Sequence, residues 1–364
     1  MTNWLFVDDQ ADAAAYASEL GKVDIKVDHI QPSAARKLLL DQNPDPAGVL
    51  MDVDLSGEVG MLGTGLGLAQ DIRARQKNGS LEDFPIIRFA NPGPIAKNVR
   101  GDPTSDDLFD DYLFKAEVGR SAVSVAARLK LTEAVYGAYH KIKREKPAGK
   151  ADVKLVEELL GLTGDQLEEW VHRALTTRLA SGFVGPIHVA AGTFLRSCFN
   201  AVGVMVDRQT LAMRLGLSAN EETWNTIEKW LASSEYRGVG QDFAERWWSS
   251  GVDQAWYSLD GASSPLSATS VAERVKILSR SLKVEFVPLK MPETSPGERP
   301  WRWCQLSLER DEPEYIPVDP SRGIKLTLPN DLPAWVDPLM ASYGVAIRQR
   351  EDTRISAADR EKLR

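Results

Sequence analysis

The chain has 364 residues, of which 43% are hydrophobic and 26% are charged, as in an ordinary globular protein. These proportions exclude a disordered chain, a collagen-like fibre and a small disulfide-rich scaffold. The formal net charge of −8 argues against a general nucleic-acid or anionic-membrane surface. The two cysteines lack metal-binding spacing, the N-terminus lacks the pattern of a signal peptide, and no stretch approaches the roughly 20 apolar residues that span a bilayer. We therefore expect a cytoplasmic protein that does not enter a membrane.

Residues 1–116 alternate short apolar runs with helical segments. The apolar runs cover 4–7, 25–30, 48–51, 84–89 and 112–114. The helical segments between them cover 11–20, 34–40 and 66–75, and Ser33 is the expected N-terminal cap of the second. Short strands bounded by helices predict a parallel sheet that is covered on both faces and whose strands end at one common edge. Ligands bind at that edge in folds of this kind.

A long helix is expected after the sheet, over residues 120–145, because apolar side chains recur there mostly at spacings of three and four. The region that follows is mainly helical. It contains two expected capping boxes, Thr163 with Gln166 and Ser218 with Glu221. A Ser hydroxyl or Thr hydroxyl three residues before Glu or Gln is typical of a helix start.

The C-terminal part is richer in turn residues. Residues 261–270 have the composition of a linker, 282–289 and 301–310 are expected to be two strands of a small β unit, and the polar tail from Arg350 is expected to be frayed. These segments define the expected domain organisation: 1–119 sheet domain, 120–148 connecting helix, 149–260 mainly helical and Trp-rich, 271–349 small α+β unit, and 350–364 tail.

Charged residues follow three of the expected strands. Asp8 and Asp9 come after the first strand, Asp52 and Asp54 after the third, and Lys115 after the last. Because parallel strands end at one edge, these groups should meet, and carboxylates brought together repel unless a cation lies among them. Oxygen ligands favour a hard ion such as Mg²⁺. A carboxylate beside a metal ion and an ammonium suits phosphoryl transfer to an aspartate.

At these residues the sequence resembles the receiver domain of bacterial response regulators. The resemblance covers about the first third of the chain, and it rests on four segments in order together with a glycine, Gly65, before a helix. The segments are Val7-Asp8-Asp9, residues 49–55, Pro85-Ile86-Ile87 and residues 112–115. The resemblance implies the flavodoxin-like α/β fold with a five-stranded parallel sheet, followed here by a long helix, a mainly helical module and a small β unit.

The resemblance also implies roles for the charged residues. Asp52 would be the phosphoacceptor, and Asp9 and Asp52 would bind Mg²⁺ directly. Asp8 would act partly through water, the Asp54 carbonyl would complete the metal ligands, and Lys115 would bridge to the phosphoryl group. The partner implied is a sensor kinase or another protein.

Four features depart from the receiver pattern. Ala90 stands where receivers carry a Ser or Thr hydroxyl that bonds the phosphoryl group, and Ala116 stands where a proline usually follows the lysine. Residues 91–104 contain three prolines and two glycines and do not predict a regular helix, and residues 56–64 lengthen the loop after Asp52. The departures leave open a working receiver with an altered relay or a pseudo-receiver that serves as a scaffold.

Other motifs favour structural interpretations. The glycines of residues 63–68 match the ATP-lid box of histidine kinases, but the other kinase boxes are missing, so a loop entering a helix is expected. His140 lies on the long helix without the acidic or catalytic neighbours of a phosphorelay histidine. Residues 208–231 are similar to a helix-turn-helix, with Trp224 and Ile227 as inward residues. Because residues 207–246 carry five basic against seven acidic side chains, DNA binding is the less favoured alternative to packing or protein docking.

Aromatic and arginine side chains gather between residues 236 and 257. The commoner interpretation is a packed core with stacked arginines, and the alternative is a protein-interface hot spot. Two functional hypotheses follow from the whole chain. The first is an atypical response-regulator-like signalling protein that accepts a phosphoryl group on Asp52 with Mg²⁺ and passes the signal to a C-terminal output module. The second is a phosphorylation-independent scaffold in a larger complex. No enzyme activity beyond self-phosphorylation is expected.

Overall fold

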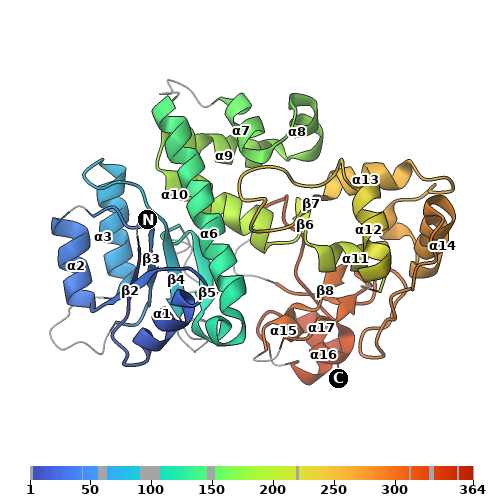
Figure 1. Cartoon of the computed structure of the whole chain (residues 1–364). Helices are drawn as coiled ribbons and strands as arrows, with labels where there is room; N and C mark the ends of the chain where they lie inside the picture. The colour runs from blue at the N-terminus through green and yellow to red at the C-terminus, as the bar shows by residue number, and fades with distance from the viewer. Residues whose placement is uncertain are drawn as a thin grey trace. The chain divides into compact units, whose positions relative to one another are not determined.

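The computed structural model describes residues 3–42, 44–55, 64–90, 107–145, 152–218, 221–310, 313–327, 332–350 and 352–363. The chain forms two compact units (Figure 1). The first unit contains Met1–Asn200 and Arg237–Ala244, and the second contains Ala201–Tyr236 and Glu245–Arg364. The finer domain boundaries drawn from the sequence divide the chain differently and stay a prediction. Within the described residues, no helix is both long and apolar enough to cross a bilayer.

The first unit is built on a parallel five-stranded sheet with the strand order β2-β1-β3-β4-β5. The strands are β1 (Trp4–Val7), β2 (Val27–Ile30), β3 (Gly48–Met51), β4 (Ile86–Ala90) and β5 (Asp111–Phe114). This order is that of the flavodoxin-like doubly wound fold, so the predicted fold class is confirmed. The bounds of β1 and β3 agree with the prediction because both runs are buried along their whole length.

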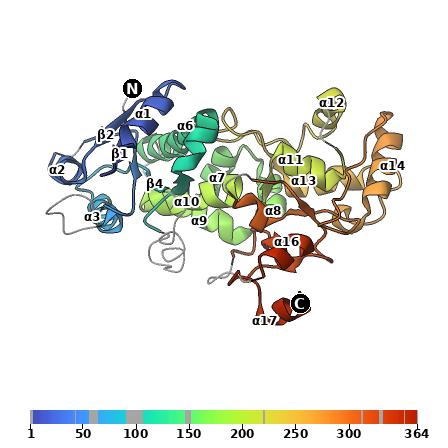
Figure 2. The same ribbon diagram turned by 90° about the horizontal axis from the view of Figure 1, so that it is seen from below.

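Helices cover both faces of this sheet (Figures 1 and 2). Side chains alternate along β1, so that Leu5 and Val7 pack with α2 (Pro32–Asp41) and α3 (Gly65–Lys77), and Trp4 and Phe6 pack with α1 (Ala13–Gly21) and α6 (Lys115–Glu145). The predicted cap Ser33 is wrong. Gln31 is the N-cap and Pro32 begins α2, because the fixed φ of proline suits the first helical position.

Helix α6 begins at Lys115, directly after β5, and has one non-helical residue, Ser121. The Ser121 hydroxyl accepts a hydrogen bond from the Ser124 amide at 3.2 Å, as a cap does. The long helix predicted over 120–145 is therefore present after this kink, and a short helical segment that carries Lys115 precedes it.

Among the described residues, further helices of the first unit follow α6 in the chain. They are α7 (Val153–Leu160), α8 (Gly164–Trp170), α9 (Arg173–Val184), α10 (Ile187–Phe194) and a π-helical turn over Leu195–Asn200. The capping box of Thr163 with Gln166 is confirmed at the start of α8. Residues 237–244 return to this unit, where the Val239 amide donates to the Leu159 carbonyl at 2.9 Å.

The second unit combines helices with three two-stranded antiparallel sheets. Its helices are α11 (Arg208–Leu215), α12 (Glu221–Trp230), α13 (Ser249–Tyr257), a 3₁₀ turn over Leu266–Ala268, α14 (Val271–Leu282), α15 (Gln305–Leu308), α16 (Tyr343–Arg348) and α17 (Ala357–Lys362). Its strands are β6 (Met205–Val206), β7 (Trp247–Trp248), β8 (Arg302–Trp303), β9 (Pro317–Val318), β10 (Ile324–Lys325) and β11 (Met340–Ala341).

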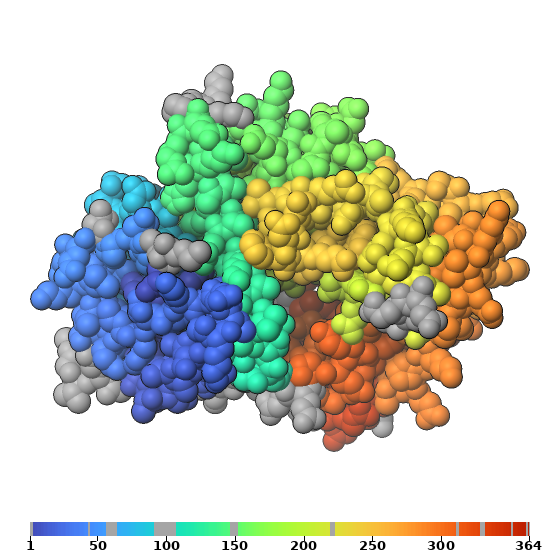
Figure 3. Space-filling model, viewed as in Figure 1, coloured from blue at the N-terminus to red at the C-terminus, as the bar shows by residue number. Residues whose placement is uncertain are grey.

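Aromatic side chains form the core of the second unit. One hydrophobic cluster contains Trp224, Trp247 and Trp256 together with side chains of α14. Helix α14 lies beside α12 and α13 (Figures 1 and 3). Tyr236 is buried as well, whereas Tyr257 is about half exposed. The core interpretation of the aromatic segment is thus confirmed for its tryptophans, and Trp224 and Ile227 point inward as predicted.

The two strands expected in the C-terminal part do not form as predicted. In place of a strand over 301–310, only β8 is extended, it pairs with β9, and α15 follows at once. Residues 282–289 form no regular strand, because Pro288 lacks the amide that a ladder needs and a single bridge joins it to Leu217.

The predicted linker and tail pack into the second unit. Leu266 is buried, and the Trp256 indole donates to the Ser264 carbonyl at 2.9 Å. The tail contains α17, capped by Ser356, and Ile355 and Leu363 join a hydrophobic cluster, so it is not frayed. The expected cap pair of Ser218 with Glu221 stays a prediction, because residues 219–220 and the Glu221 side chain lie outside the described part of the chain.

Candidate functional site at the strand ends

The register of the sheet brings two aspartates together. Val7 of β1 lies opposite Met51 of β3, and the Asp52 amide donates to the Val7 carbonyl at 3.0 Å. Asp8 and Asp52 therefore leave neighbouring strands at the same level. Lys115 follows β5 at the same edge of the sheet and is the first residue of α6.

One ammonium contacts both carboxylates. Lys115 Nζ lies 2.6 Å from Asp8 Oδ2 and 2.5 Å from Asp52 Oδ2. We call these three residues the strand-end triad. Lys115 and Asp8 are 2% and 0% exposed, and Asp52 is 8% exposed, so Asp52 is the most accessible carboxylate of the three. The triad carries a formal charge of −1 in a place from which most water is excluded.

Burial and pairing act on the triad in opposite directions. Burial raises the pKa of Asp8, and this exceeds the lowering effect of Lys115 and of the Gln10 amide. Burial lowers the pKa of Lys115, but its hydrogen bonds to Asp52 and Asp8 outweigh that effect, so its pKa stands above the ordinary value. Lys115 is therefore held in its charged form, and ionising the Asp8 carboxyl group requires more free energy here than it does in water.

Backbone contacts fix the two aspartates. The Gln10 amide donates to Asp8 Oδ1 at 2.8 Å, and the Asp54 amide donates to Asp52 Oδ1 at 3.2 Å. Gly65 begins α3 directly against the Asp52 backbone, where a Cβ atom would lie 1.9 Å from the Asp52 carbonyl oxygen. Only glycine allows this close approach of the helix start to the strand end.

His29 was missed by the sequence interpretation. Its ring Nε2 lies 2.9 Å from the Asp8 carbonyl oxygen and contacts the loop that carries Asp8. His29 lies on β2, the strand beside β1. Its place near the end of a strand that pairs with β1 is the sequence signal for this contact, although no apolar run ends at His29.

The Asp9 carboxylate, a predicted metal ligand, does not join the triad. Asp9 Oδ1 accepts a hydrogen bond from Gln10 Nε2 at 2.7 Å at the surface. The Asp54 side chain is exposed, and the predicted role of its backbone carbonyl stays a prediction. Among the described residues, no group of three or more acidic, histidine or cysteine side chains is close enough to hold a metal ion. The structure thus brings Asp8 and Asp52 together with Lys115, and it does not gather all four aspartates.

The departures from the receiver pattern are visible where the structure describes them. Ala90 ends β4 and is paired with Phe114 of β5, the residue before Lys115. Ala116 continues α6 without a break. Residues 56–63 and 91–104 lie outside the described residues. At residue 64 the loop ends in a helix cap, because the Thr64 hydroxyl accepts from the Gly67 amide at 3.2 Å.

The other motifs make structural contacts. His140 Nε2 lies 2.7 Å from the Asp83 carbonyl oxygen, a contact of the fold. In the helix pair of 208–231, the Arg208 guanidinium lies over the Trp224 ring at 4.8 Å, and the buried Arg214 pairs with Asp337 at 2.5 Å. Both arginines therefore make contacts within the unit, which argues against their binding the phosphate groups of DNA. DNA binding itself stays a prediction that is not favoured.

Comparisons with known proteins place receiver domains among similar structures. No protein-family model and no curated protein matches the sequence. The receiver domain of NtrX from Brucella abortus is 22% identical over 35% of this chain and 97% of its own, with a TM-score of 0.27. The N-terminal domain of a response regulator/sensory box/GGDEF protein from Carboxydothermus hydrogenoformans is 23% identical over 36% of this chain and 97% of its own, with a TM-score of 0.26.

A third similar structure is a response regulator from Burkholderia pseudomallei, which contains a phosphorylated aspartic acid, a calcium ion and citrate. It is 15% identical over 48% of this chain and 100% of its own, with a TM-score of 0.25. The C-terminal part of the chain is not identified. The fold of the first unit is defined by its own strand order.

Proposed function

We propose that the chain is an atypical response-regulator-like signalling protein whose first unit accepts a phosphoryl group on Asp52. The observation that carries this proposal is the contact of Lys115 Nζ with both Asp52 and Asp8 at the edge where the strands end. A carboxylate nucleophile beside a held ammonium is the arrangement that phosphoryl transfer to aspartate requires. We propose no catalysis beyond this self-phosphorylation.

The proposed step needs no proton. An Asp52 carboxylate oxygen attacks the phosphorus of a small donor such as acetyl phosphate. The new O–P bond forms as the bond from phosphorus to the donor oxygen breaks, and acetate leaves with the electron pair. Lys115 keeps its proton and stabilises charge on the phosphoryl oxygens, while the Asp54 and Gln10 amides hold the two aspartates in place.

Magnesium is part of the proposal. Mg²⁺ is commonly held by one or two carboxylates, with waters and phosphate oxygens as its other ligands. Asp8 and Asp52 supply such a pair. Burial raises the pKa of Asp8 because its charge is costly there, and a cation beside both carboxylates would offset that cost. Asp9 and the Asp54 carbonyl are the additional ligands that the receiver resemblance implies. When bound, the ion would neutralise charge on the transferred group.

The test is the intact mass of the purified full chain after incubation with Mg²⁺ and acetyl phosphate. We expect one phosphoryl adduct on the native chain, none on Asp52→Asn, and none when EDTA removes the metal. Asp54→Asn is the matched control, because it changes an exposed carboxylate two residues away and keeps the backbone carbonyl. An unmodified native chain, or an equal adduct on Asp52→Asn, would overturn the proposal.

A second candidate function, a pseudo-receiver scaffold, is favoured by Ala90. A methyl group there cannot bond a phosphoryl oxygen, so an adduct would lack one contact that receivers use. We expect Ala90→Ser to lengthen the lifetime of the adduct, measured as its decay after the donor is removed. If the native chain forms no adduct and its interactions with a partner protein are the same for Asp52→Asn, the scaffold function holds.

A further inference from the structure

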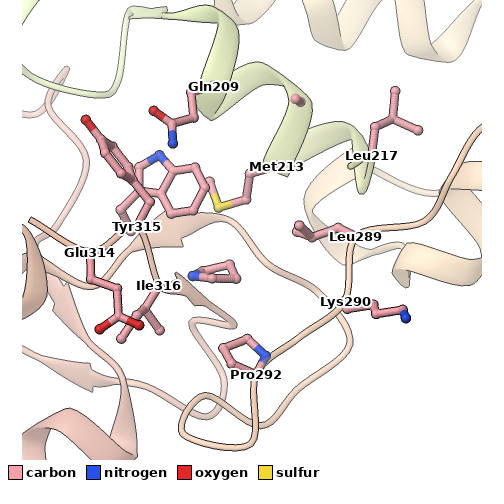
Figure 4. A pocket seen from close by; sticks show the side chains of 12 residues that line it. Gln209, Met213, Leu217, Leu289, Lys290, Pro292, Glu314, Tyr315 and Ile316 are labelled. Atoms are coloured by element: carbon pink, nitrogen blue, oxygen red, sulfur yellow. The ribbon is translucent and has the colours of Figure 1, made fainter. Parts of the chain in front are cut away.

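The second unit has a cleft that the proposed function does not use. The cleft has a volume of about 360 Å³ and lies between α11, the segment 289–292 and the segment 314–316 that leads into β9. Its apolar wall includes Met213, Ile316 and Pro292 (Figure 4). Trp303 and Pro317 also line it. This volume is within the range of sites that bind small ligands or short peptide segments.

An aromatic pair forms one side of the cleft. The rings of Trp303 and Tyr315 meet edge to face with centroids 5.4 Å apart. The Trp303 indole donates to the Thr210 hydroxyl at 3.0 Å, and the Thr210 amide donates to the Asp207 carboxylate at 2.7 Å. The indole is thereby fixed, and its one donor is already used. Tyr315 is 51% exposed, so its ring face is available to a ligand.

The two ends of the cleft differ in charge. Figure 4 shows Glu314 and Lys290 on opposite sides, with Met213, Ile316 and Pro292 between them. The Glu314 side chain is 62% exposed, and its ion pair with Arg310 at 3.7 Å is long and open to water, so it is weak. The acidic end therefore suits a basic side chain, and the basic end suits an acidic group or a carbonyl oxygen.

Two backbone groups of the cleft walls are already engaged within the unit. The Leu289 amide donates to the Gly216 carbonyl at 2.8 Å, and the Ile316 carbonyl accepts from the Cys304 amide at 2.8 Å. A ligand N–H group that lies against the apolar part of the wall would lose its bond to water without replacing it. Proline has no N–H group, and the polyproline II conformation needs no internal hydrogen bonds.

We propose that this cleft binds an extended, proline-containing segment of a partner protein, with a basic side chain at the Glu314 end. Prolines pack on the Trp303–Tyr315 pair and on Met213, and the basic group pairs with Glu314. In other aromatic grooves that bind polyproline II segments, prolines likewise stack on aromatic rings while a charged group binds at one end. The site lies in the second unit, so it does not depend on phosphoryl transfer at Asp52.

The test is isothermal titration of the full chain with a short synthetic peptide of alternating proline and leucine that ends in one arginine. We expect saturable binding, at least about tenfold weaker binding to Tyr315→Ala, and weaker binding to Glu314→Lys at low salt. Two control variants should bind as the native chain does. Tyr257→Ala removes a tyrosine of similar exposure outside the cleft, and Glu273→Lys reverses a charge on α14.

The choice of peptide makes the outcome decisive. A version with every proline replaced by alanine should bind at least about tenfold more weakly. The proposal is overturned if the native chain does not bind the proline peptide, if the alanine version binds equally, or if Tyr315→Ala and Glu314→Lys leave binding unchanged. It is also overturned if the chain self-associates and Tyr315→Ala abolishes that association, because a second copy would then occupy the cleft.

Discussion

The two edges of the parallel sheet hold buried charges in different ways. At the edge where the strands begin, Asp110 accepts hydrogen bonds from Arg73 Nη2 at 2.6 Å, the Tyr136 hydroxyl at 2.7 Å and the Ile86 amide at 2.7 Å. Arg73 in turn donates to the carbonyls of Leu108 and Phe84 at 3.0 Å. At the opposite edge, one lysine serves two aspartates and the formal charge does not balance.

This difference separates a structural network from a candidate site. Asp110 and Asp8 are both fully buried, yet Asp110 has a charge partner and a full set of donors within the fold. Asp8 shares its cation with Asp52. A saturated network gains nothing from a ligand, whereas an edge with one negative charge in excess is stabilised by a further cation.

The largest expected effect is the difference in the free energy of unfolding between two aspartate-to-asparagine variants, one at each edge of the sheet. Asp110→Asn removes the charge that faces the buried Arg73 and should lower the free energy of unfolding by about 3–5 kcal/mol. Asp8→Asn should change it by less than about 1 kcal/mol, because Lys115 keeps Asp52 as its partner and the cost of burying the Asp8 charge disappears. Urea unfolding of the two full-length variants measures both values.

Tyr136→Phe is the matched control for the structural edge. It removes one hydrogen bond to Asp110 and leaves the ion pair, so a loss of about 1 kcal/mol is expected. Equal losses for Asp110→Asn and Asp8→Asn would show that the two edges do not differ in the way proposed. Stability of Asp8→Asn close to that of the native chain, with no phosphoryl adduct, would support a site that is retained for function.

A smaller effect is expected where α3 meets the site. Gly65→Ala places a methyl group against the Asp52 carbonyl, so the helix start or the strand end must shift. We expect a loss of about 1–3 kcal/mol in the free energy of unfolding and a reduced rate of adduct formation on Asp52. Urea unfolding and intact-mass labelling give the two measurements.

Gly67→Ala provides the control on the same helix turn. A Cβ atom there would meet only the Thr64 hydroxyl oxygen, at 3.9 Å, and alanine is the better helix former by about 1 kcal/mol. This variant should be as stable as the native chain or more stable, with unchanged labelling. If both glycine variants behave alike, the close approach of Gly65 to Asp52 has no role in positioning the site.

The sheet and its charged edge could be predicted because both depend on local pattern. Buried runs such as 48–51 are apolar at every position, and Asp52 and Lys115 come directly after strands, so the rule that parallel strands end together brings them to one edge. His29 escaped the same rule because it lies inside β2 among half-buried residues, where no apolar run ends in an evident charge.

The second unit was predicted less well because its elements depend on distant partners. Ile355 and Leu363 look like isolated apolar residues in a polar tail, and only the cluster that they join explains why α17 is ordered. The two residues of β8 are extended because β9 lies beside them, which no local pattern shows. Likewise, Arg274 is fully buried because carbonyls of Leu266, Arg214 and Pro300 surround its guanidinium.

The smallest expected effect on stability concerns Asp319, a carboxylate that accepts most of its hydrogen bonds from backbone amides. Asp319 of the second unit is 3% exposed and accepts from the amides of Glu298, Arg299 and Ser321 and from the Ser321 hydroxyl. Burial acts to raise its pKa, but these hydrogen bonds together hold the pKa below the ordinary value of 3.8. Asp319 resembles Asp110 in accepting several hydrogen bonds from the fold, but burial raises the pKa of Asp110, as it raises that of Asp8.

The sign of the pH dependence follows from this lowered pKa. A carboxyl group whose pKa falls on folding stabilises the fold at pH values above 3.8, and that stabilisation is lost as the pH falls through the folded value. Asp319→Asn should thus cost about 1–2 kcal/mol at neutral pH and much less in acid. Urea unfolding of both proteins at neutral and acid pH checks this, with the exposed Asp260→Asn as control. A cost that stays constant across the acid range would mean that the charge of Asp319 does not stabilise its loop, and that saturation by backbone donors fails to distinguish the carboxylates of this chain.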